Sequence, residues 1–377
     1  MTVGADPAVA AHDLPDQAGY GGRAVRGLTY LGRLFDLGPG FAAAARDAVA
    51  VLFGGWAQRI SRGIDEPEAA RGRAPFEFSL VLGDRVPGVR IFFRPLSPEG
   101  PTTANASWEQ GWRTLRALED SGVASLTRAR GVRDLFAPRS DQAAFGMCVA
   151  ATVRASGVAG PKVYFDTLAS GADANRRVIG AAMERLGHGA AWRWLQRHDP
   201  EGMARPMPAF FALDLHDSPQ ARIKFYTTVD ERSGDALQDR VGRLSPAARR
   251  GAADLLEALS TDGSASLAAP GTRPTLCWNM TEGDRPADAA LYLPFRSHTP
   301  SGREALDRLR PFVRPEHLHR LTRLVTDAAQ GRERAHRDEE PVNPFHWAAA
   351  KLNRSALGPL SLYVSAELVD RASGAGT

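Results

Sequence analysis

Hydrophobic and polar residues follow two different spacings along the chain, one helical and one strand-like. In the helix predicted over residues 41–61, Val49, Leu52, Phe53 and Trp56 follow the i, i+3, i+4, i+7 spacing of a single helix face. Further helices are predicted over residues 24–36, 104–121, 173–197, 236–260, 301–330 and 343–354. Short strand-like runs separate most of these helices, so the chain alternates between the two kinds of element.

The strand-like runs come mainly in pairs, joined by short turns that contain glycine or proline. They cover residues 76–82 and 89–93, 147–154 and 162–167, 209–215 and 222–229, 275–281 and 289–295, with a last run at 360–367. Hairpins favour antiparallel pairing, because parallel strands would need a helix between each pair. The pattern predicts an α+β fold of repeated ααββ units, in which about ten strands close into an antiparallel β-barrel ringed by α-helices. An open sheet layered with helices is the alternative, and closure is preferred because it leaves no strand edge.

Composition agrees with one folded domain. The chain has 377 residues, of which 43% are hydrophobic, and no internal segment is rich enough in Pro, Gly or Ser to divide it. We expect a flexible leader over residues 1–22, a single domain over 23–370 and a flexible tail over 371–377. No long apolar run predicts a membrane span, and the N-terminus has no signal-peptide pattern, so the cytoplasm is the expected location. Two cysteines far apart in sequence, Cys148 and Cys277, provide no disulfide framework.

The distribution of charge suggests an alternative function, the binding of nucleic acid. Arginines are dense in the predicted helical stretch 303–323, which would suit a nucleic-acid-binding protein. The formal net charge is only +4, which favours an exposed helix without such a partner. A salt-sensitive gel shift would indicate nucleic-acid binding.

Metal and cofactor motifs are absent from the sequence. No Asp-Asp-x-x-Asp motif offers carboxylates for Mg²⁺, and the acidic run at residues 338–340 is typical of a solvated loop. His317 and His319 are two residues apart in a predicted helix and therefore do not share a face for zinc. No Walker loop or dinucleotide-binding fingerprint is present, so we expect no cofactor.

Two of the three lysines lie two residues before a tyrosine in a predicted strand. These pairs are Lys162 with Tyr164 and Lys224 with Tyr226, and chance would give roughly 0.05 such pairs. Alternate strand residues face the same side, so Arg222, Lys224 and Tyr226 share one face. Cations enclosed in a barrel need an anionic ligand rich in oxygen atoms, such as a diphosphate. The alternative is an ordinary solvent-exposed strand face.

Glu77 is a carboxylate flanked by aromatic residues in an otherwise apolar strand, and Arg90 lies on the strand that follows. Opposite charges commonly pair across neighbouring strands, so a Glu77–Arg90 ion pair is one interpretation. In the other, Arg90 faces the diphosphate and Glu77 accepts a hydrogen bond from an acceptor molecule, such as an indole N–H.

Several short motifs, taken in order, resemble those of the dimethylallyltryptophan synthase family of aromatic prenyltransferases, especially its bacterial indole-modifying branch. The similar motifs are Pro75-x-Glu77-x-Ser79, Val89-Arg90, Lys162-x-Tyr164, Arg222-x-Lys224-x-Tyr226, Tyr292-x-Pro294 and Tyr363-Val364-Ser365. They span residues 70–368, and the fold of that family is a barrel of ten antiparallel strands inside a ring of helices.

The resemblance implies a function and a set of roles. It implies metal-independent transfer of a dimethylallyl group from dimethylallyl diphosphate to tryptophan or a tryptophan-derived indole in secondary metabolism, with geranyl diphosphate as the alternative donor. It implies that Glu77 orients the indole through its N–H, that the diphosphate is held by Arg90, Lys162, Arg222 and Lys224, and that the allylic cation is shielded by Tyr164, Tyr226, Tyr292 and Tyr363. Neither nucleic acid nor a membrane is an expected partner. A non-catalytic isoprenoid-binding barrel is a further alternative, which turnover would exclude.

The sequence departs from the family pattern in three places. Fungal relatives carry a glutamine where this chain has Ala290, and a lysine on the strand that here runs from Met147 to Arg154 and contains none. No arginine clearly matches the one that grips the amino-acid carboxylate in the family, and Arg205 is the candidate for that role. Trp278 either faces the lumen, where it would shorten the donor pocket, or belongs to the core.

Overall fold

Ten strands form a closed antiparallel barrel in the computed structural model, which describes residues 19–60, 74–139, 143, 145–200, 203, 210–229, 234–259, 274–333, 342–353 and 357–373. The strands are β1 (Phe76–Leu82), β2 (Val89–Phe93), β3 (Met147–Arg154), β4 (Gly157–Asp166), β5 (Phe210–Asp214), β6 (Ile223–Thr228), β7 (Thr275–Met280), β8 (Asp288–Leu293), β9 (Phe345–Leu352) and β10 (Leu357–Val364). Each strand pairs with its neighbours in sequence, and β1 pairs with β10 to close the barrel. The predicted closed barrel is confirmed, and the open sheet is excluded.

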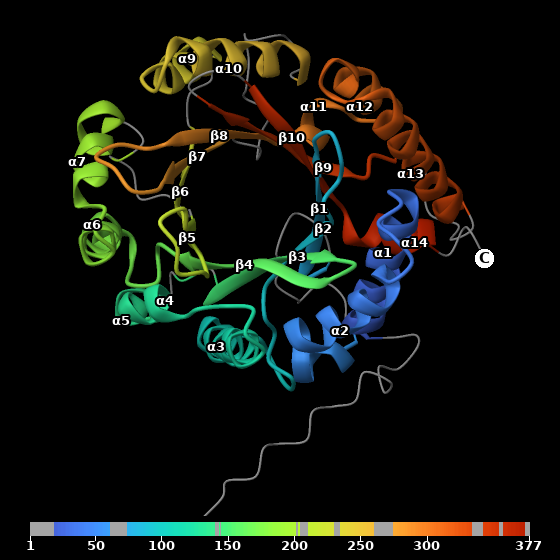
Figure 1. Cartoon of the computed structure of the whole chain (residues 1–377), viewed down its shortest axis with the longest axis horizontal. Coiled ribbons are helices and arrows are strands. Elements are labelled where there is room, and N and C mark those ends of the chain that lie inside the picture. Colours follow the sequence, from blue (N-terminus) through green and yellow to red (C-terminus); the bar gives the residue numbers. More distant parts are fainter. Residues whose placement is uncertain are drawn as a thin grey trace, which may run out of the picture.

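Helices surround the barrel on its outside, as Figure 1 shows in a view down the shortest axis of the molecule. The α-helices are α1 (Tyr20–Leu34), α2 (Phe41–Phe53), α3 (Ala104–Asp120), α4 (Thr127–Gly131), α5 (Arg133–Phe136), α6 (Asn175–Arg185), α7 (Gly189–His198), α9 (Gly234–Gly242), α10 (Pro246–Leu259), α11 (Phe295–His298), α12 (Gly302–Leu309), α13 (Pro315–Glu333) and α14 (Ala366–Ser373). Short 3₁₀ turns lie at Gly54–Gln58, Ala172–Ala174 and Arg310–Phe312. The helices cover the outer face of the sheet and leave its inner face to the lumen.

The main hydrophobic core lies between the outer face of the barrel and the helices. On β1, the alternate residues Phe76 and Phe78 are buried on this outer side, and Phe76 packs against Phe53 of α2 with ring centroids 5.5 Å apart. A second, smaller apolar cluster lines the lumen and includes Phe92, Tyr164 and Tyr226. Alternate residues of each strand therefore belong either to the outer hydrophobic core, which stabilises the fold, or to the lining of the lumen.

Close backbone packing fixes α3 against the start of β3. Thr103 caps α3 by accepting a hydrogen bond from the backbone N–H of Ala106, and Gly122 follows the helix with φ +72°. A Cβ atom on Gly146 would lie 2.1 Å from the carbonyl oxygen of Ala104, so only glycine fits at this approach. The predicted helix over 104–121 is confirmed to within one residue.

The predicted helix over residues 343–354 is wrong, because most of this segment forms β9. Three alanines in succession, Ala348–Ala350, favour a helix by intrinsic propensity. In the fold, β9 pairs with both β8 and β10, so tertiary hydrogen bonding outweighs that preference. With this extra strand, the last predicted strand, which was expected to stand alone, forms a fifth hairpin of β9 and β10.

Helices lie near both ends of the part of the chain that the structure describes. Helix α1 begins at Tyr20, four residues before the predicted helix, and α14 continues to Ser373. The predicted leader and tail otherwise lie outside the described residues. Across the described part of the chain, no helix is long and apolar enough to cross a membrane.

Candidate active site

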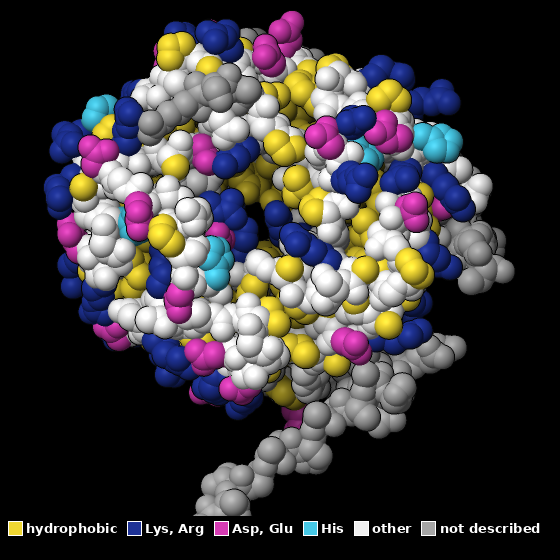
Figure 2. Space-filling view, viewed as in Figure 1, with side chains coloured by type: hydrophobic (Ala, Val, Ile, Leu, Met, Phe, Trp, Pro, Cys, Tyr) yellow, Lys and Arg dark blue, Asp and Glu magenta, His cyan; other side chains and the backbone are white. Residues whose placement is uncertain are grey.

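Cationic and phenolic side chains from separate strands meet on the inner face of the barrel. The register places Lys162 of β4 opposite Asp214 of β5, and Lys224 of β6 opposite Asn279 of β7. Figure 2 shows lysine and arginine side chains gathered around the opening at the centre of one face of the molecule. The two Lys-x-Tyr motifs, which are far apart in sequence, therefore contribute to one lumen.

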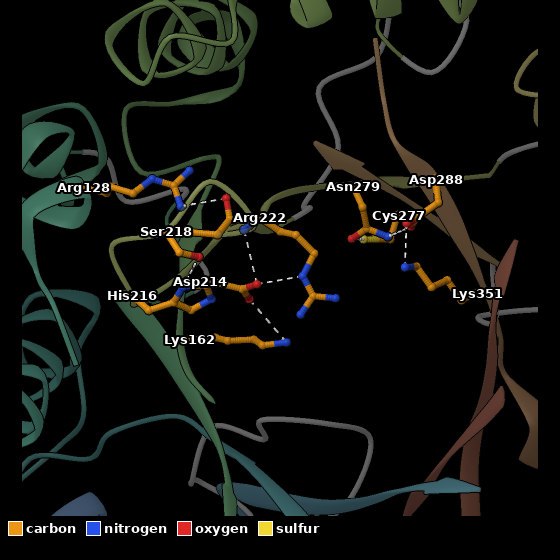
Figure 3. Close-up of polar contacts among 11 residues, drawn as sticks. Arg128, Lys162, Asp214, His216, Ser218, Arg222, Cys277, Asn279, Asp288 and Lys351 are labelled. Atoms are coloured by element: carbon orange, nitrogen blue, oxygen red, sulfur yellow. Dashed lines mark hydrogen bonds and ion pairs between the residues drawn. The ribbon is translucent and has the colours of Figure 1, made fainter. Parts of the chain in front are cut away.

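Asp214 lies between two of the predicted diphosphate-binding cations. Its Oδ2 accepts a hydrogen bond from Arg222 Nε at 2.7 Å, and its Oδ1 is 3.4 Å from Lys162 Nζ. Figure 3 shows the carboxylate of Asp214 between these two side chains. The neighbouring cations lower the pKa of Asp214 to about 2 although burial raises it, so the carboxylate stays ionised. Sequence analysis did not identify Asp214, although its alternation with Ala212 in a predicted strand would have placed it on this face.

Two more cations complete this group. Lys224 alternates with Tyr226 on β6, and Arg90 alternates with Phe92 on β2; both of these aromatic residues line the lumen. Burial lowers the pKa of Lys224, and the charges of Arg222 and Arg90 lower it further. The charge of Arg90 also interacts with all four predicted shield tyrosines, Tyr164, Tyr226, Tyr292 and Tyr363. Arg90, Lys162, Arg222 and Lys224 are thus brought together in the lumen.

A second charged group lies beside the first, on the neighbouring strands β7, β8 and β9. Lys351 Nζ of β9 is 2.7 Å from Asp288 Oδ2, and Asn279 Nδ2 donates to Asp288 Oδ1 at 2.6 Å (Figure 3). Lys351 pairs in register with Ala290, the position at which fungal relatives carry glutamine. Lys351 was missed as a site residue because its segment was predicted to be helical.

The four predicted shield tyrosines form a continuous chain of rings along β4, β6, β8 and β10. Ring centroids are 6.1 Å apart for Tyr164 and Tyr226, 5.7 Å for Tyr226 and Tyr292, and 5.8 Å for Tyr292 and Tyr363. Phe210 lies within 5.8 Å of both Tyr164 and Tyr226. Burial raises the pKa of each of these tyrosines, so the rings present neutral phenols to the lumen.

Glu77 is buried on the lumen face of β1 without an ion pair or a hydrogen bond to any described residue. The register places it opposite Phe92, while Arg90 lies opposite Ser79. The Glu77–Arg90 ion pair, which was one interpretation of the sequence, is therefore absent from the described residues. Burial alone raises the pKa of Glu77 from 4.5 to about 8, and its Oε2 keeps an unused capacity to accept a hydrogen bond.

Trp278 does not face the lumen, so the donor-pocket interpretation of this residue is wrong. Its indole N–H donates to Asp199 Oδ2 at 3.2 Å, and its ring lies 6.2 Å from that of Trp194 on α7. It is fully buried between the barrel wall and the helices. The adjacent Cys277 takes the lumen side, opposite Tyr226. Arg205, the candidate for a carboxylate contact, lies outside the described residues.

The alternative functions gain no support from surface residues. Arg308 pairs with Glu304, Arg310 with Asp307, and Arg314 with both Asp84 and Glu316, so the arginine-rich stretch is largely neutralised. His317 Nε2 lies 2.9 Å from the carbonyl oxygen of Gly83. No group of metal-binding side chains occurs among the described residues. The acidic run at 338–340 lies outside them.

Comparisons with known proteins agree with this geometry. A family model described as tryptophan dimethylallyltransferase matches residues 68–323. The chain is similar to the structure of PriB in a binary complex with product diphosphate, at 26% identity and a TM-score of 0.76 over 93% of this chain and 97% of that one. It is similar to PriB in a ternary complex with L-tryptophan and dimethylallyl thiolodiphosphate, at 25% identity, with the same TM-score and coverage. It is also similar to 6-dimethylallyltryptophan synthase from Micromonospora olivasterospora in complex with DMASPP and Trp, at 25% identity and a TM-score of 0.76, over 94% of this chain and 99% of that one.

Proposed function

Because the chain belongs to the tryptophan dimethylallyltransferase family, we propose that it transfers a dimethylallyl group from dimethylallyl diphosphate to the indole ring of tryptophan or of a tryptophan-derived compound. The observation that carries this proposal is the convergence of buried cations and a chain of tyrosines in one closed barrel. The similar structures were obtained with tryptophan and a dimethylallyl diphosphate analogue, which agrees with the same pair of substrates.

In this proposal the cations of the lumen hold the diphosphate. Positive charge comes from Arg90 on β2, Lys162 on β4, Lys224 on β6 and Arg222 just before β6. A diphosphate supplies the oxygens that these side chains need. Lys351 adds charge from β9, beside Ala290. Fixed cations are most effective where negative charge develops, so they lower the barrier to loss of the diphosphate. They perform the electrostatic task for which other prenyl-transferring enzymes use Mg²⁺.

The tyrosine chain protects the allylic cation. When the carbon–oxygen bond of the donor breaks, its electron pair leaves with the diphosphate and an allylic cation remains. The faces of Tyr164, Tyr226, Tyr292 and Tyr363 stabilise this cation through their π-electrons. The same rings exclude water, which would otherwise convert the cation to an alcohol.

Glu77 orients the acceptor in this proposal. Its Oε2 has no hydrogen-bond partner in the described part of the chain and is buried, so an indole N–H would satisfy it. A ring carbon then attacks the allylic cation to form the new carbon–carbon bond, and loss of a proton from that carbon restores aromaticity. A hydrogen bond from the indole to the carboxylate favours the ionised form of Glu77 and increases the electron density of the ring.

We also propose that residues 23–370 act as one catalytic domain, since strands from β1 to β10 all contribute to the same barrel. A cytoplasmic location belongs to the same proposal. It is supported by two buried cysteines that are not joined by a disulfide, Cys148 and Cys277.

The test is incubation of the purified protein with dimethylallyl diphosphate and a panel of indoles in excess EDTA. Mass spectrometry should detect a product heavier by one dimethylallyl group, and NMR should identify the ring carbon and the mode of attachment. Competition between geranyl diphosphate and dimethylallyl diphosphate measures which donor chain length the protein prefers. Tight isoprenoid diphosphate binding without turnover would favour the non-catalytic barrel, and activity that disappears with EDTA would contradict the metal-independent mechanism.

A further inference from the structure

Asp214 is an unexpected residue in a lumen that is otherwise suited to an anion. It is only 4% exposed and accepts hydrogen bonds from both the side chain and the backbone N–H of Arg222 through Oδ2. Its Oδ1 has no hydrogen-bond partner in the described residues and lies 3.4 Å from Lys162 Nζ. A buried carboxylate here repels a diphosphate, so its presence requires an explanation beyond donor binding itself.

Lys162 is surrounded by like charges. Arg90 faces it from β2, Lys224 from β6 and Arg222 from the position just before β6, and its partner on β3 is an uncharged alanine. Burial lowers the pKa of Lys162 most strongly, and the three cations lower it further, whereas Asp214 raises it. In the empty barrel, Asp214 is therefore the neighbour that favours the charged form of this lysine.

We propose that Asp214 is a positioning residue that keeps Lys162 charged and Arg222 in place while the lumen is empty. The diphosphate then meets a preformed cationic site and supplies, on binding, the negative charge that Asp214 provided alone. Such preorganisation lowers the cost of binding, because no side chain must be reordered or protonated at that moment. This inference rests on the proposed function, since it concerns the same donor site.

Asp288 provides a matched comparison within the same lumen. It pairs with Lys351, whose side chain is 41% exposed, whereas that of Lys162 is 9% exposed. Water can solvate the ammonium group of Lys351, so this lysine does not depend on a carboxylate for its charge. Removing Asp214 and removing Asp288 should therefore have different consequences, although each change removes one buried negative charge.

The experiment compares the wild-type protein with Asp214→Asn, Asp214→Glu and Asp288→Asn. Binding of inorganic pyrophosphate is measured by calorimetry between about pH 6 and about pH 9. Dividing each variant's Kd by the wild-type Kd at the same pH cancels the effect that the ionisation of pyrophosphate itself has on binding. Circular dichroism and thermal unfolding check that each variant is folded.

For Asp214→Asn, we expect pyrophosphate affinity equal to or above the wild-type value at the acid end, because a negative charge has been removed. As the pH rises, affinity should begin to fall at a lower pH than in the wild type, by roughly tenfold per pH unit once Lys162 loses its proton. Asp214→Glu should largely restore the wild-type profile, and Asp288→Asn should leave the position of the fall unchanged.

A Kd ratio for Asp214→Asn that is constant across the pH range would overturn the inference, since it would indicate structural damage or no role. A shift of equal size in Asp288→Asn would do so as well, because it would show a general charge effect. Failure of the wild-type protein to bind pyrophosphate at any pH would instead contradict the proposed function.

Discussion

Replacing Glu77 by glutamine should stabilise the protein while impairing its activity. Burial without a partner raises the pKa of this carboxyl from 4.5 to about 8. The folded protein therefore retains a proton that the unfolded chain releases between these two values. Stability is unaffected by Glu77 below about pH 4.5 and declines as the pH rises toward about pH 8.

The magnitude follows from the size of the pKa change. Each pKa unit corresponds to about 1.4 kcal/mol, so a rise from 4.5 to about 8 costs about 5 kcal/mol of unfolding free energy above pH 8. Glutamine has nearly the same shape and no charge to desolvate. The variant should thus be more stable than the wild type by an amount that is small near pH 5 and reaches several kcal/mol near pH 8.

Urea unfolding of both proteins at about pH 5 and about pH 8 measures this difference. Prenylation of the preferred indole under the same conditions should fall by about ten- to a hundredfold in kcat/KM, because an amide replaces the carboxylate that accepts the indole N–H. A stability gain that is the same at both pH values would refute the buried-carboxylate reasoning, and unchanged kcat/KM would refute the assigned role.

Three further predictions concern other buried groups. Lys224→Ala should lower turnover by at least about a hundredfold while leaving the circular dichroism spectrum of the folded protein unchanged, because a fixed cation near the leaving diphosphate is lost; near-normal turnover would contradict its role. Tyr226→Ala should raise the ratio of free prenyl alcohol to prenylated indole, measured by chromatography, because a gap in the ring chain admits water; Tyr226→Phe, which keeps the ring, is the control, and an unchanged ratio in the alanine variant would count against the shield. His346→Leu should stabilise the protein more at about pH 4.5 than at about pH 7: burial lowers the pKa of His346 from 6.5 to about 4, so the wild type loses up to about 3 kcal/mol as the pH falls through this interval. Equal gains at both pH values would exclude this explanation.

The sequence predicted the lumen best where side-chain alternation and an unusual residue type coincided. Lys162 with Tyr164 and Lys224 with Tyr226 lie two residues apart on single strands, so their common face follows from backbone geometry alone. The tyrosine chain could be predicted only through the family resemblance, because Tyr292 and Tyr363 meet across β9, a strand that was predicted to be a helix.

Other features depended on register between strands, which one strand does not reveal. Glu77 and Arg90 are offset by two positions across the β1–β2 hairpin, so opposite charges on neighbouring strands did not become a pair. Trp278 faces outward because β6 and β7 place Cys277 opposite Tyr226. Lys351 was missed because helix propensity and strand pairing disagree in β9, and hydrogen bonding on both sides of that strand decides the outcome.

The arrangement of two separate apolar layers explains how this barrel tolerates so many unfavourable groups. The outer layer between sheet and helices contains most of the buried aromatic and aliphatic side chains, and burial of apolar surface is the main source of folding free energy. The lumen contains an unpaired carboxyl at Glu77 and clustered cations around Lys162, each of which lowers stability in the empty protein. Because the two layers share only the backbone of the strands, the lumen can keep groups that are satisfied only by substrates. The lumen groups that lower the stability of the protein are the same groups that bind a diphosphate and an indole. Both substrates therefore meet side chains that are already in position.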